Sequence, residues 1–244
     1  MSTAPPAGPG QEGTEDAYEF EPLAEARNYR RAILKEFSPW LAGDVLEVGA
    51  GVGQFTAELA GCNPIRRLSV VEPDPGFCGQ IREKCSGVEV IEGPVTAIEA
   101  QRAFDAVVAV NVLEHIEDDV GELRRYRTCL QARKGAVCLF VPAGPELYAP
   151  LDRQFGHYRR YSRGGLRDAL ASAGFSTVYL RYFNFPGYFL WWLEFCVFKQ
   201  REFRARRVWL FDRLVFPAIH FIESRCIRPP KGQSLIAVAK AVGR

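Results

Sequence analysis

The chain has 244 residues, of which 48% are hydrophobic and 25% are charged, and its net charge at pH 7 is +2. This composition is that of an ordinary soluble globular protein, which excludes collagen-like and wholly disordered chains and gives no case for a nucleic-acid partner. The seven cysteines are scattered without a CxxC pair. We therefore expect no metal site and no disulfide framework, but reduced thiols in a cytoplasmic protein.

Charge is distributed unevenly along the chain. Residues 1–30 contain six acidic and two basic residues, whereas residues 181–231 contain ten basic and four acidic ones. Residues 1–16 lack the basic and apolar regions of a signal peptide and are rich in Pro and Gly, so they predict a disordered leader. Residues 17–244 are expected to form one domain.

Hydrophobic periodicity predicts helices and strands in alternation. Apolar residues at helical spacing predict one or two helices in residues 17–42. Short apolar runs predict seven strands, in residues 44–48, 66–74, 88–93, 104–116, 136–143, 176–183 and 234–242. Helical patterns lie between most of them, in residues 54–60, 75–85, 118–132 and 164–175. This order predicts an α/β fold, a Rossmann-like, seven-stranded and mostly parallel sheet with helices on both faces.

A glycine-rich loop follows the first predicted strand. The segment Glu47-Val-Gly49-Ala-Gly51-Val-Gly53 lets the backbone approach a ligand closely, and the N-terminus of the next helix favours polar or anionic groups. A dinucleotide fingerprint needs glycines at positions 1, 3 and 6, but position 6 here is Gln54. A nicotinamide-dependent oxidoreductase is therefore disfavoured.

The segment instead resembles motif I of the class I S-adenosylmethionine-dependent methyltransferases. Glu72, 19 residues beyond Gly53, resembles the acid that binds the ribose hydroxyls in that family, and the Asn111–Ile116 segment resembles motif IV of its small-molecule branches. Asn28-Tyr29 is similar to the lid that covers the cofactor, within residues 17–42. The resemblance implies S-adenosyl-L-methionine as cofactor and these residues as its site: Tyr29, Glu47, Gly49, Ala50, Gly51, Gly53, Glu72, Pro73, Val95, Asn111 and Val112.

One position departs from the family pattern. The Gly-Asp pair that often follows the third strand is Gly93-Pro94 here, and proline offers neither a carboxylate nor an N–H group. Contact with the adenine would then fall to the backbone of Val95 or to Glu92.

The loop after the fifth predicted strand is the expected acceptor site. His157 has the chemistry of a general base, with Asp152 to orient it and Tyr161 beside it as a third catalytic candidate. Arg159 and Arg160 could bind an anionic group, and Tyr148 could line a pocket. The alternative is that these residues form an Asp–His–Arg network that stabilises the loop and has no part in catalysis.

Residues 186–231 form an aromatic and arginine-rich insertion before the last strand, predicted to be helical. Its longest apolar runs are interrupted by Glu194 and Asp212, so it does not span a bilayer. It is interpreted as a cap over an apolar acceptor pocket, as a peripheral membrane contact, or as a homodimer contact.

The sequence thus predicts methyl transfer to a hydrophobic small molecule, a secondary metabolite or a lipid-linked substrate, with oxygen as the favoured acceptor atom. The alternative outside the enzymes is a non-catalytic partner subunit that keeps the methyltransferase fold.

Overall fold

The computed structural model describes residues 25–130, 135–200, 205–225 and 228–242. The predicted leader, residues 1–16, lies outside these ranges. Seven strands form one sheet: β1 (Gly43–Val48), β2 (Ile65–Glu72), β3 (Glu89–Glu92), β4 (Ala106–Val110), β5 (Ala136–Pro142), β6 (Phe175–Phe183) and β7 (Ser234–Ala241). The described helices are α2 (Arg27–Phe37), α3 (Gln54–Ala60), α4 (Pro75–Lys84), α5 (Asp119–Cys129), α6 (Pro150–Gln154), α7 (Arg163–Ser172), α8 (Phe185–Trp191), α9 (Ala205–Leu210) and α10 (Phe216–Arg225).

The strand order is β3-β2-β1-β4-β5-β7-β6, and only β7 runs antiparallel to its neighbours β5 and β6. The predicted mostly parallel, Rossmann-like sheet is therefore confirmed. The chain leaves β1 toward β2 on one side and later returns to β4 on the other. Such a switch point opens a crevice beyond the carboxyl ends of the two strands, which is where α/β proteins bind ligands.

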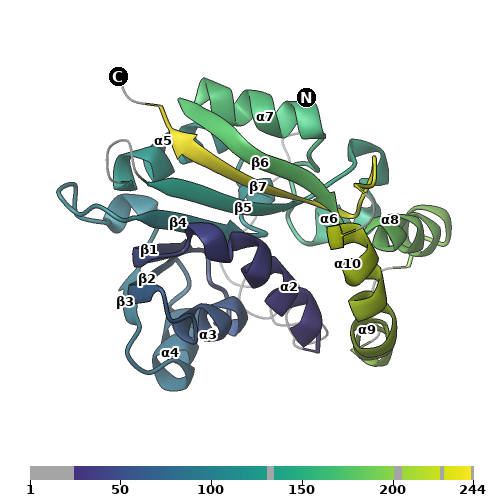
Figure 1. Ribbon diagram of the computed structural model, residues 1–244, viewed down its shortest axis with the longest axis horizontal. Helices are drawn as coiled ribbons and strands as arrows, with labels where there is room; N and C mark the ends of the chain where they lie inside the picture. The colour runs from purple at the N-terminus through teal and green to yellow at the C-terminus, as the bar shows by residue number, and fades with distance from the viewer. Residues whose placement is uncertain (1–24, 131–134, 201–204, 226–227, 243–244) are drawn as a thin grey trace, which may run out of the picture.

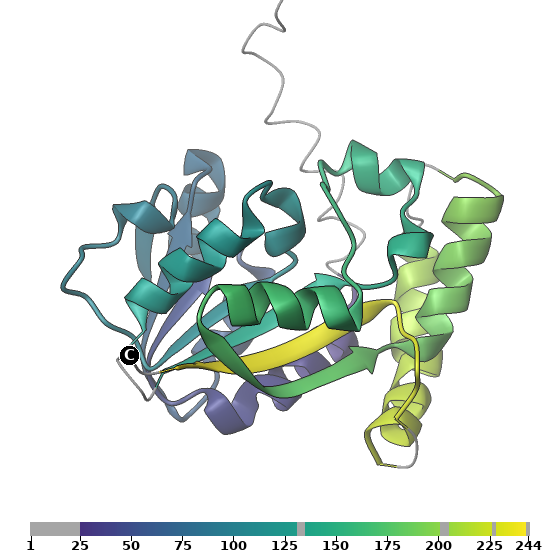
Figure 2. The ribbon, with the colours of Figure 1, turned by 90° about the horizontal axis from the view of Figure 1, so that it is seen from above.

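Alternate residues of the central strands feed two cores, because successive side chains of a strand point to opposite faces. One core joins Leu46, Val107 and Leu139 to residues of α5 and α7. The other joins Val45 and Val108 to residues of α2 and α3. Figures 1 and 2 show α5 and α7 on one side of the sheet and α2 and α3 on the other.

Two segments differ from their predictions. The predicted strand 104–116 ends at Val110, because Asn111 takes a left-handed conformation (φ 52°) and Leu113–His115 forms a 3-10 turn. The loop between β5 and α7 contains the 3-10 turn Pro145–Leu147 and helix α6. Both differences place polar side chains at the carboxyl end of the sheet.

The insertion forms helices α8, α9 and α10, with π-helical turns at Trp192–Val197 and Phe211–Val215. We call these described residues, 185–200 and 205–225, the cap. The cap lies at the end of the sheet where β7 begins (Figures 1 and 2). Within the described ranges, no helix is long and apolar enough to cross a bilayer.

Two buried carboxylates of the cap stabilise helices that lack an acid of their own in the first turn. Asp212 accepts hydrogen bonds from the backbone N–H groups of Asn28 (3.0 Å) and Tyr29 (2.8 Å) at the start of α2. Glu223 accepts those of Asn184 (3.0 Å) and Phe185 (2.6 Å) at the start of α8. These bonds satisfy N–H groups that a helix leaves unpaired, and the negative charge complements the helix dipole.

Candidate functional site

The glycine loop connects β1 to α3 and requires its glycines for steric reasons. Gly49 has a φ of 67°, and a Cβ atom there would lie 2.7 Å from a methyl carbon of Val112. Gly53 is the N-cap of α3 in a left-handed conformation (φ 79°), and its Cβ would lie 3.0 Å from Ile81. The loop therefore packs as closely as backbone allows against both neighbouring segments.

Glu72 ends β2 and is almost fully buried beside this loop. Its carboxylate accepts the N–H of Gly51 (2.9 Å) through one oxygen and the N–H of Asp74 (3.0 Å) through the other. Asp74, and not Glu72, is the N-cap of α4, since its side chain accepts the N–H of Phe77. Helix capping therefore does not account for Glu72. A carboxylate oxygen can accept more than one hydrogen bond, so this pair suits a ligand diol.

Glu47 is a second buried carboxylate at the same point. One of its oxygens is buried without a hydrogen-bond partner among the described residues. Burial and the negative charge of Glu72, opposed only in part by a hydrogen bond with Thr56, raise the pKa of Glu47 to about 7. Two carboxylates and a tight glycine turn fit the hydroxyl and amino groups of an S-adenosylmethionine molecule, which donate hydrogen bonds.

The other cofactor candidates lie around this loop at the carboxyl edge of the sheet. Ala50 accepts the N–H of Gly53 (3.0 Å) and packs near Ile81. Pro73 follows Glu72 directly, and Val95 is buried in the 3-10 turn after β3. Asn111 and Val112 follow β4, so both sides of the switch point carry predicted residues.

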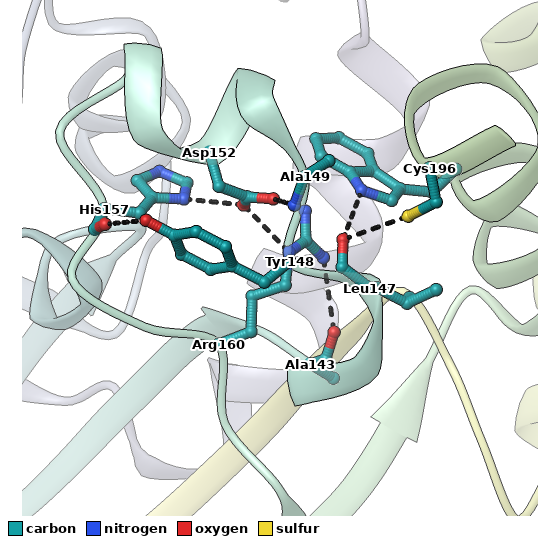
Figure 3. Close-up of polar contacts among 9 residues, drawn as sticks. Ala143, Leu147, Tyr148, Ala149, Asp152, His157, Arg160 and Cys196 are labelled. Carbon is teal, nitrogen blue, oxygen red and sulfur yellow. Dashed lines mark hydrogen bonds and ion pairs between the residues drawn. The ribbon is translucent and has the colours of Figure 1, made fainter. Parts of the chain in front are cut away.

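Asp152 is fully buried and holds the acceptor loop together (Figure 3). One carboxylate oxygen accepts Nδ1 of His157 (2.9 Å) and Nε of Arg160 (2.8 Å), and the other accepts the backbone N–H of Ala149 (2.8 Å). Burial raises the pKa of Asp152, but the hydrogen bonds and the Arg160 charge outweigh it and hold that pKa below its ordinary value. Asp152 therefore stays ionised at neutral pH.

His157 is oriented by this carboxylate. With Nδ1–H donated to Asp152, the neutral imidazole carries its lone pair on Nε2. Nε2 is buried and has no hydrogen-bond partner among the described residues, and His157 lines a cavity. Its ring meets that of His115 edge to face, with centroids 4.6 Å apart. Burial and the proximity of His157 lower the pKa of His115 to about 4.

The cavity has a volume of about 790 Å³ and lies between the sheet and the cap. Its walls include Phe140 from β5, Tyr29 from α2 and Asn111 beside the glycine loop. Apolar cap residues form much of the rest: Phe189, Leu190, Trp191, Phe195, Leu210 and Val215. Polar and charged residues line it from both the sheet side and the cap, but its surface is mainly apolar. Such a chamber suits a hydrophobic molecule with a polar reacting end.

The structure brings only some of the predicted acceptor residues to this cavity. Arg160 lines it and stacks on Trp191, with 4.0 Å between the guanidinium carbon and the ring centroid. Tyr148 instead donates its hydroxyl to the backbone of His157 (2.7 Å) and supports the loop. Arg159 pairs with Asp119 (2.8 Å) outside the cavity.

Tyr161 and Tyr29 have different surroundings. The hydroxyl of Tyr161 donates to Asp119 (2.8 Å) within the core, and burial with this hydrogen bond raises its pKa. It does not line the cavity. Tyr29 does, and its hydroxyl lies 3.4 Å from Ser234. Burial raises the pKa of Tyr29 to about 12.

Sequence reasoning missed three contributors to this site. Glu114 lines the cavity and is fully buried; the sequence placed it in the Asn111–Ile116 segment that resembles motif IV but gave it no role of its own. Trp191 was recognised as an aromatic of the insertion, but its stack on Arg160 was not. Asp212 was read as an interruption of an apolar segment, yet it caps α2. A lone acid within an apolar segment is a usable signal, because burial requires a partner.

Comparison with known proteins finds similarity to methyltransferases. A family model described as a methyltransferase domain matches residues 46–135. No curated protein matches the chain. A SAM-dependent methyltransferase from Thermotoga maritima has a TM-score of 0.64 at 18% identity, with 93% of this chain and 96% of that one covered.

Two further solved structures are similar. One is a chain from the complex between the Haloferax volcanii Trm112 methyltransferase activator and a methyltransferase. It has a TM-score of 0.62 at 15% identity, and the match covers 95% of this chain and 99% of that one. The N-methyltransferase NodS from Bradyrhizobium japonicum, solved with S-adenosyl-L-homocysteine, has a TM-score of 0.58 at 15% identity, covering 94% and 93%. These likenesses show the fold. Together with the family model, they confirm the resemblance to the class I methyltransferases.

The raised pKa of Glu47 predicts a pH-dependent stability. The folded state binds this proton more tightly than the unfolded state, so stability falls as pH rises from about 4.5 to about 7. Glu47→Gln removes this loss, and we expect the variant to gain roughly 2–4 kcal/mol over the wild type between pH 4.5 and pH 8. Denaturant unfolding across this range measures the difference, with exposed Glu83→Gln as control. If the free energy of unfolding of Glu47→Gln and of the wild type changed with pH in parallel, the raised pKa of Glu47 would be contradicted.

Proposed function

We propose that this chain, which carries a methyltransferase domain on the class I fold, transfers a methyl group from S-adenosyl-L-methionine to an oxygen of a hydrophobic acceptor held in the cavity. The observation that carries the proposal is the Asp152–His157 pair: Nδ1 of His157 is held by the carboxylate, Nε2 has no hydrogen-bond partner among the described residues, and His157 lines a cavity that also reaches Asn111. The bound cofactor supplies a methyl group on a sulfonium sulfur, which keeps the bonding electrons when the methyl group leaves.

The chain's own residues position the reactants. Glu72 and Glu47 hold the cofactor at the switch point, and the cap excludes water from the acceptor. In-line displacement gains most of its rate from such positioning in a dry pocket. His157 takes the proton of the acceptor hydroxyl at Nε2, and Asp152 stabilises the charged imidazole that results.

The cap suggests where the acceptor comes from. Of the fifteen large hydrophobic side chains exposed in the described chain, twelve lie in the cap. Four of these also line the cavity: Phe189, Leu190, Leu210 and Val215. The outer apolar face is therefore continuous with the inner chamber, so an acyl or prenyl chain could enter from a lipid surface without crossing water.

Charge favours an anionic lipid surface over a second copy of the chain. The described cap contains three acids, of which Asp212 and Glu223 are buried as helix caps. The third, Glu194, pairs with Arg207 at 2.7 Å. The exposed cations Lys199, Arg206, Arg213 and Arg225 then leave the surface of the described cap with a net positive charge. Such a face attracts anionic headgroups and repels its own copy. We therefore propose peripheral contact with a membrane and a lipid-linked acceptor.

Loss of the Glu72 carboxylate should weaken cofactor binding. We expect Glu72→Ala to raise the Kd for S-adenosylhomocysteine at least about tenfold, which is roughly 1.4 kcal/mol. Isothermal titration calorimetry measures this directly, with Glu83→Ala as the exposed control. An unchanged Kd in Glu72→Ala would remove this residue from the cofactor site.

Loss of the His157 imidazole should stop transfer without affecting the cofactor. We expect His157→Ala to lower methyl transfer about a hundredfold or more, with the Kd for S-adenosylhomocysteine unchanged. Transfer is measured as tritium moved from labelled S-adenosylmethionine into the organic phase of a total lipid extract. Full activity in His157→Ala would exclude it as the base. Cofactor binding with no transfer by the wild type would instead favour the non-catalytic alternative.

Membrane contact should depend on the apolar side chains of the cap. We expect the chain to sediment with vesicles of phosphatidylcholine and phosphatidylglycerol, and Phe198→Asp and Leu214→Asp to reduce this strongly, since these residues are 64% and 67% exposed. Val178→Asp is the matched control, because Val178 is 49% exposed on β6, outside the cap. Concentration-dependent dimerisation without vesicle binding would contradict the proposal and assign the cap to self-association.

A further inference from the structure

Three side chains with metal-ligating atoms converge at the cavity wall. Glu114 and His115 belong to the 3-10 turn after β4, and His157 belongs to the loop after α6. One ligand atom of each residue lies within 4.8 Å of the other two. Glu114 is fully buried, and Glu114 and His157 line the cavity. The set is therefore an enclosed carboxylate with two imidazoles.

Each imidazole is held through one nitrogen and leaves the other for a ligand. Nδ1 of His157 is bound to the carboxylate of Asp152 at 2.9 Å, and Nε2 is buried without a hydrogen-bond partner among the described residues. His115 is hydrogen-bonded to the backbone of Phe155. Metal-binding histidines show this arrangement, in which a carboxylate or a backbone carbonyl fixes the ring from behind.

We propose that Glu114, His115 and His157 bind a divalent transition-metal cation at the wall of the acceptor cavity. Two imidazoles and one carboxylate suit Zn²⁺, Mn²⁺, Fe²⁺ or Co²⁺, and three protein ligands leave a position open for a further ligand. Ligand atoms about 2.0–2.2 Å from one cation lie roughly 3–4 Å apart. The side chains here need to close by about 1 Å to reach this geometry.

The inference deepens the proposed function. The role given to the open coordination position, which is to bind the acceptor oxygen, rests on that proposed function. Glu114 and His157 line the cavity in which the acceptor oxygen would lie, so a cation held by them would supply a Lewis acid there. With a cation bound, the Nε2 lone pair of His157 is used as a ligand. We expect His157→Ala to be inactive whether His157 is a cation ligand or a general base. Only a requirement of methyl transfer for a cation distinguishes these two roles.

Cation binding is tested on the full chain with Mn²⁺ and Co²⁺, after treatment with EDTA and its removal. Zn²⁺ is a poor probe, because the described residues contain six free cysteines. Mn²⁺ binding is followed by electron paramagnetic resonance, and Co²⁺ by its visible absorption. We expect one equivalent to bind, and binding to weaken at least about a hundredfold in Glu114→Gln and His115→Gln. Asp152→Asn, a positioning residue, should weaken it about 10–100-fold.

The matched control is His220→Gln, since His220 stacks on Phe216 in the cap and belongs to no ligand cluster among the described residues. It should bind both cations as the wild type does. The S-adenosylhomocysteine-induced rise in Tm is measured for every variant, and an unchanged rise shows that the fold and the cofactor site are intact.

The two proposals fail separately. Equal Mn²⁺ and Co²⁺ binding by the wild type, Glu114→Gln and His115→Gln, or no binding by the wild type at 1 mM cation, would overturn the cation site. Full methyl transfer by the EDTA-treated protein would leave the proposed function standing with His157 as base, and would remove the cation from it. Site-specific cation binding without transfer to any lipid fraction would support the cation site and count against the proposed function.

Discussion

The buried carboxylate of Asp152 is the group on which the proposed acceptor site depends. It is fully buried and accepts three N–H donors, from Ala149, His157 and Arg160. A buried charge of this kind is tolerated only when its partners are complete, and each partner is tied elsewhere. Arg160 also donates to the carbonyl of Ala143 (3.2 Å) and stacks on Trp191. One side chain thus fixes the imidazole, the loop after β5 and the contact of that loop with the cap.

The cap is joined to the sheet by the same physical means. Asp212 and Glu223 accept hydrogen bonds from N–H groups at the starts of α2 and α8, so the helix that resembles a cofactor lid and the first helix of the cap both begin on acids of the insertion. The arrangement has a consequence at the surface. Because these carboxylates are buried, Glu194, which pairs with Arg207, is the one acid left near the surface of the described cap. A cap that closes the acceptor site also presents a basic, apolar face to its surroundings.

The sequence predicted the elements with strong local signals. The glycines after β1 and the acid that ends β2 could be recognised from their spacing alone, because backbone conformation and strand ends place them. Prediction failed where contacts between segments distant in the sequence determine the local structure. The apolar run after Val110 looked like strand, but Asn111 turns left-handed and donates its N–H to Phe140 (2.8 Å), which ends β4 and starts the turn carrying Glu114. The bond of Asp212 to α2 spans 184 residues, so no local pattern could reveal it.

The two halves of the site meet through one contact. Val112 packs its methyl groups against Gly49, where a Cβ atom would lie at 2.7 Å. On one side of Val112 is the glycine loop that resembles motif I; on the other are Glu114 and His115 at the acceptor cavity. At a φ of 67° a side chain at Gly49 strains its own backbone. Its Cβ atom also displaces Val112, the residue directly before the turn that holds Glu114 and His115. The absence of a side chain at Gly49 thus lets the glycine loop after β1 and the segment after β4 pack directly against each other.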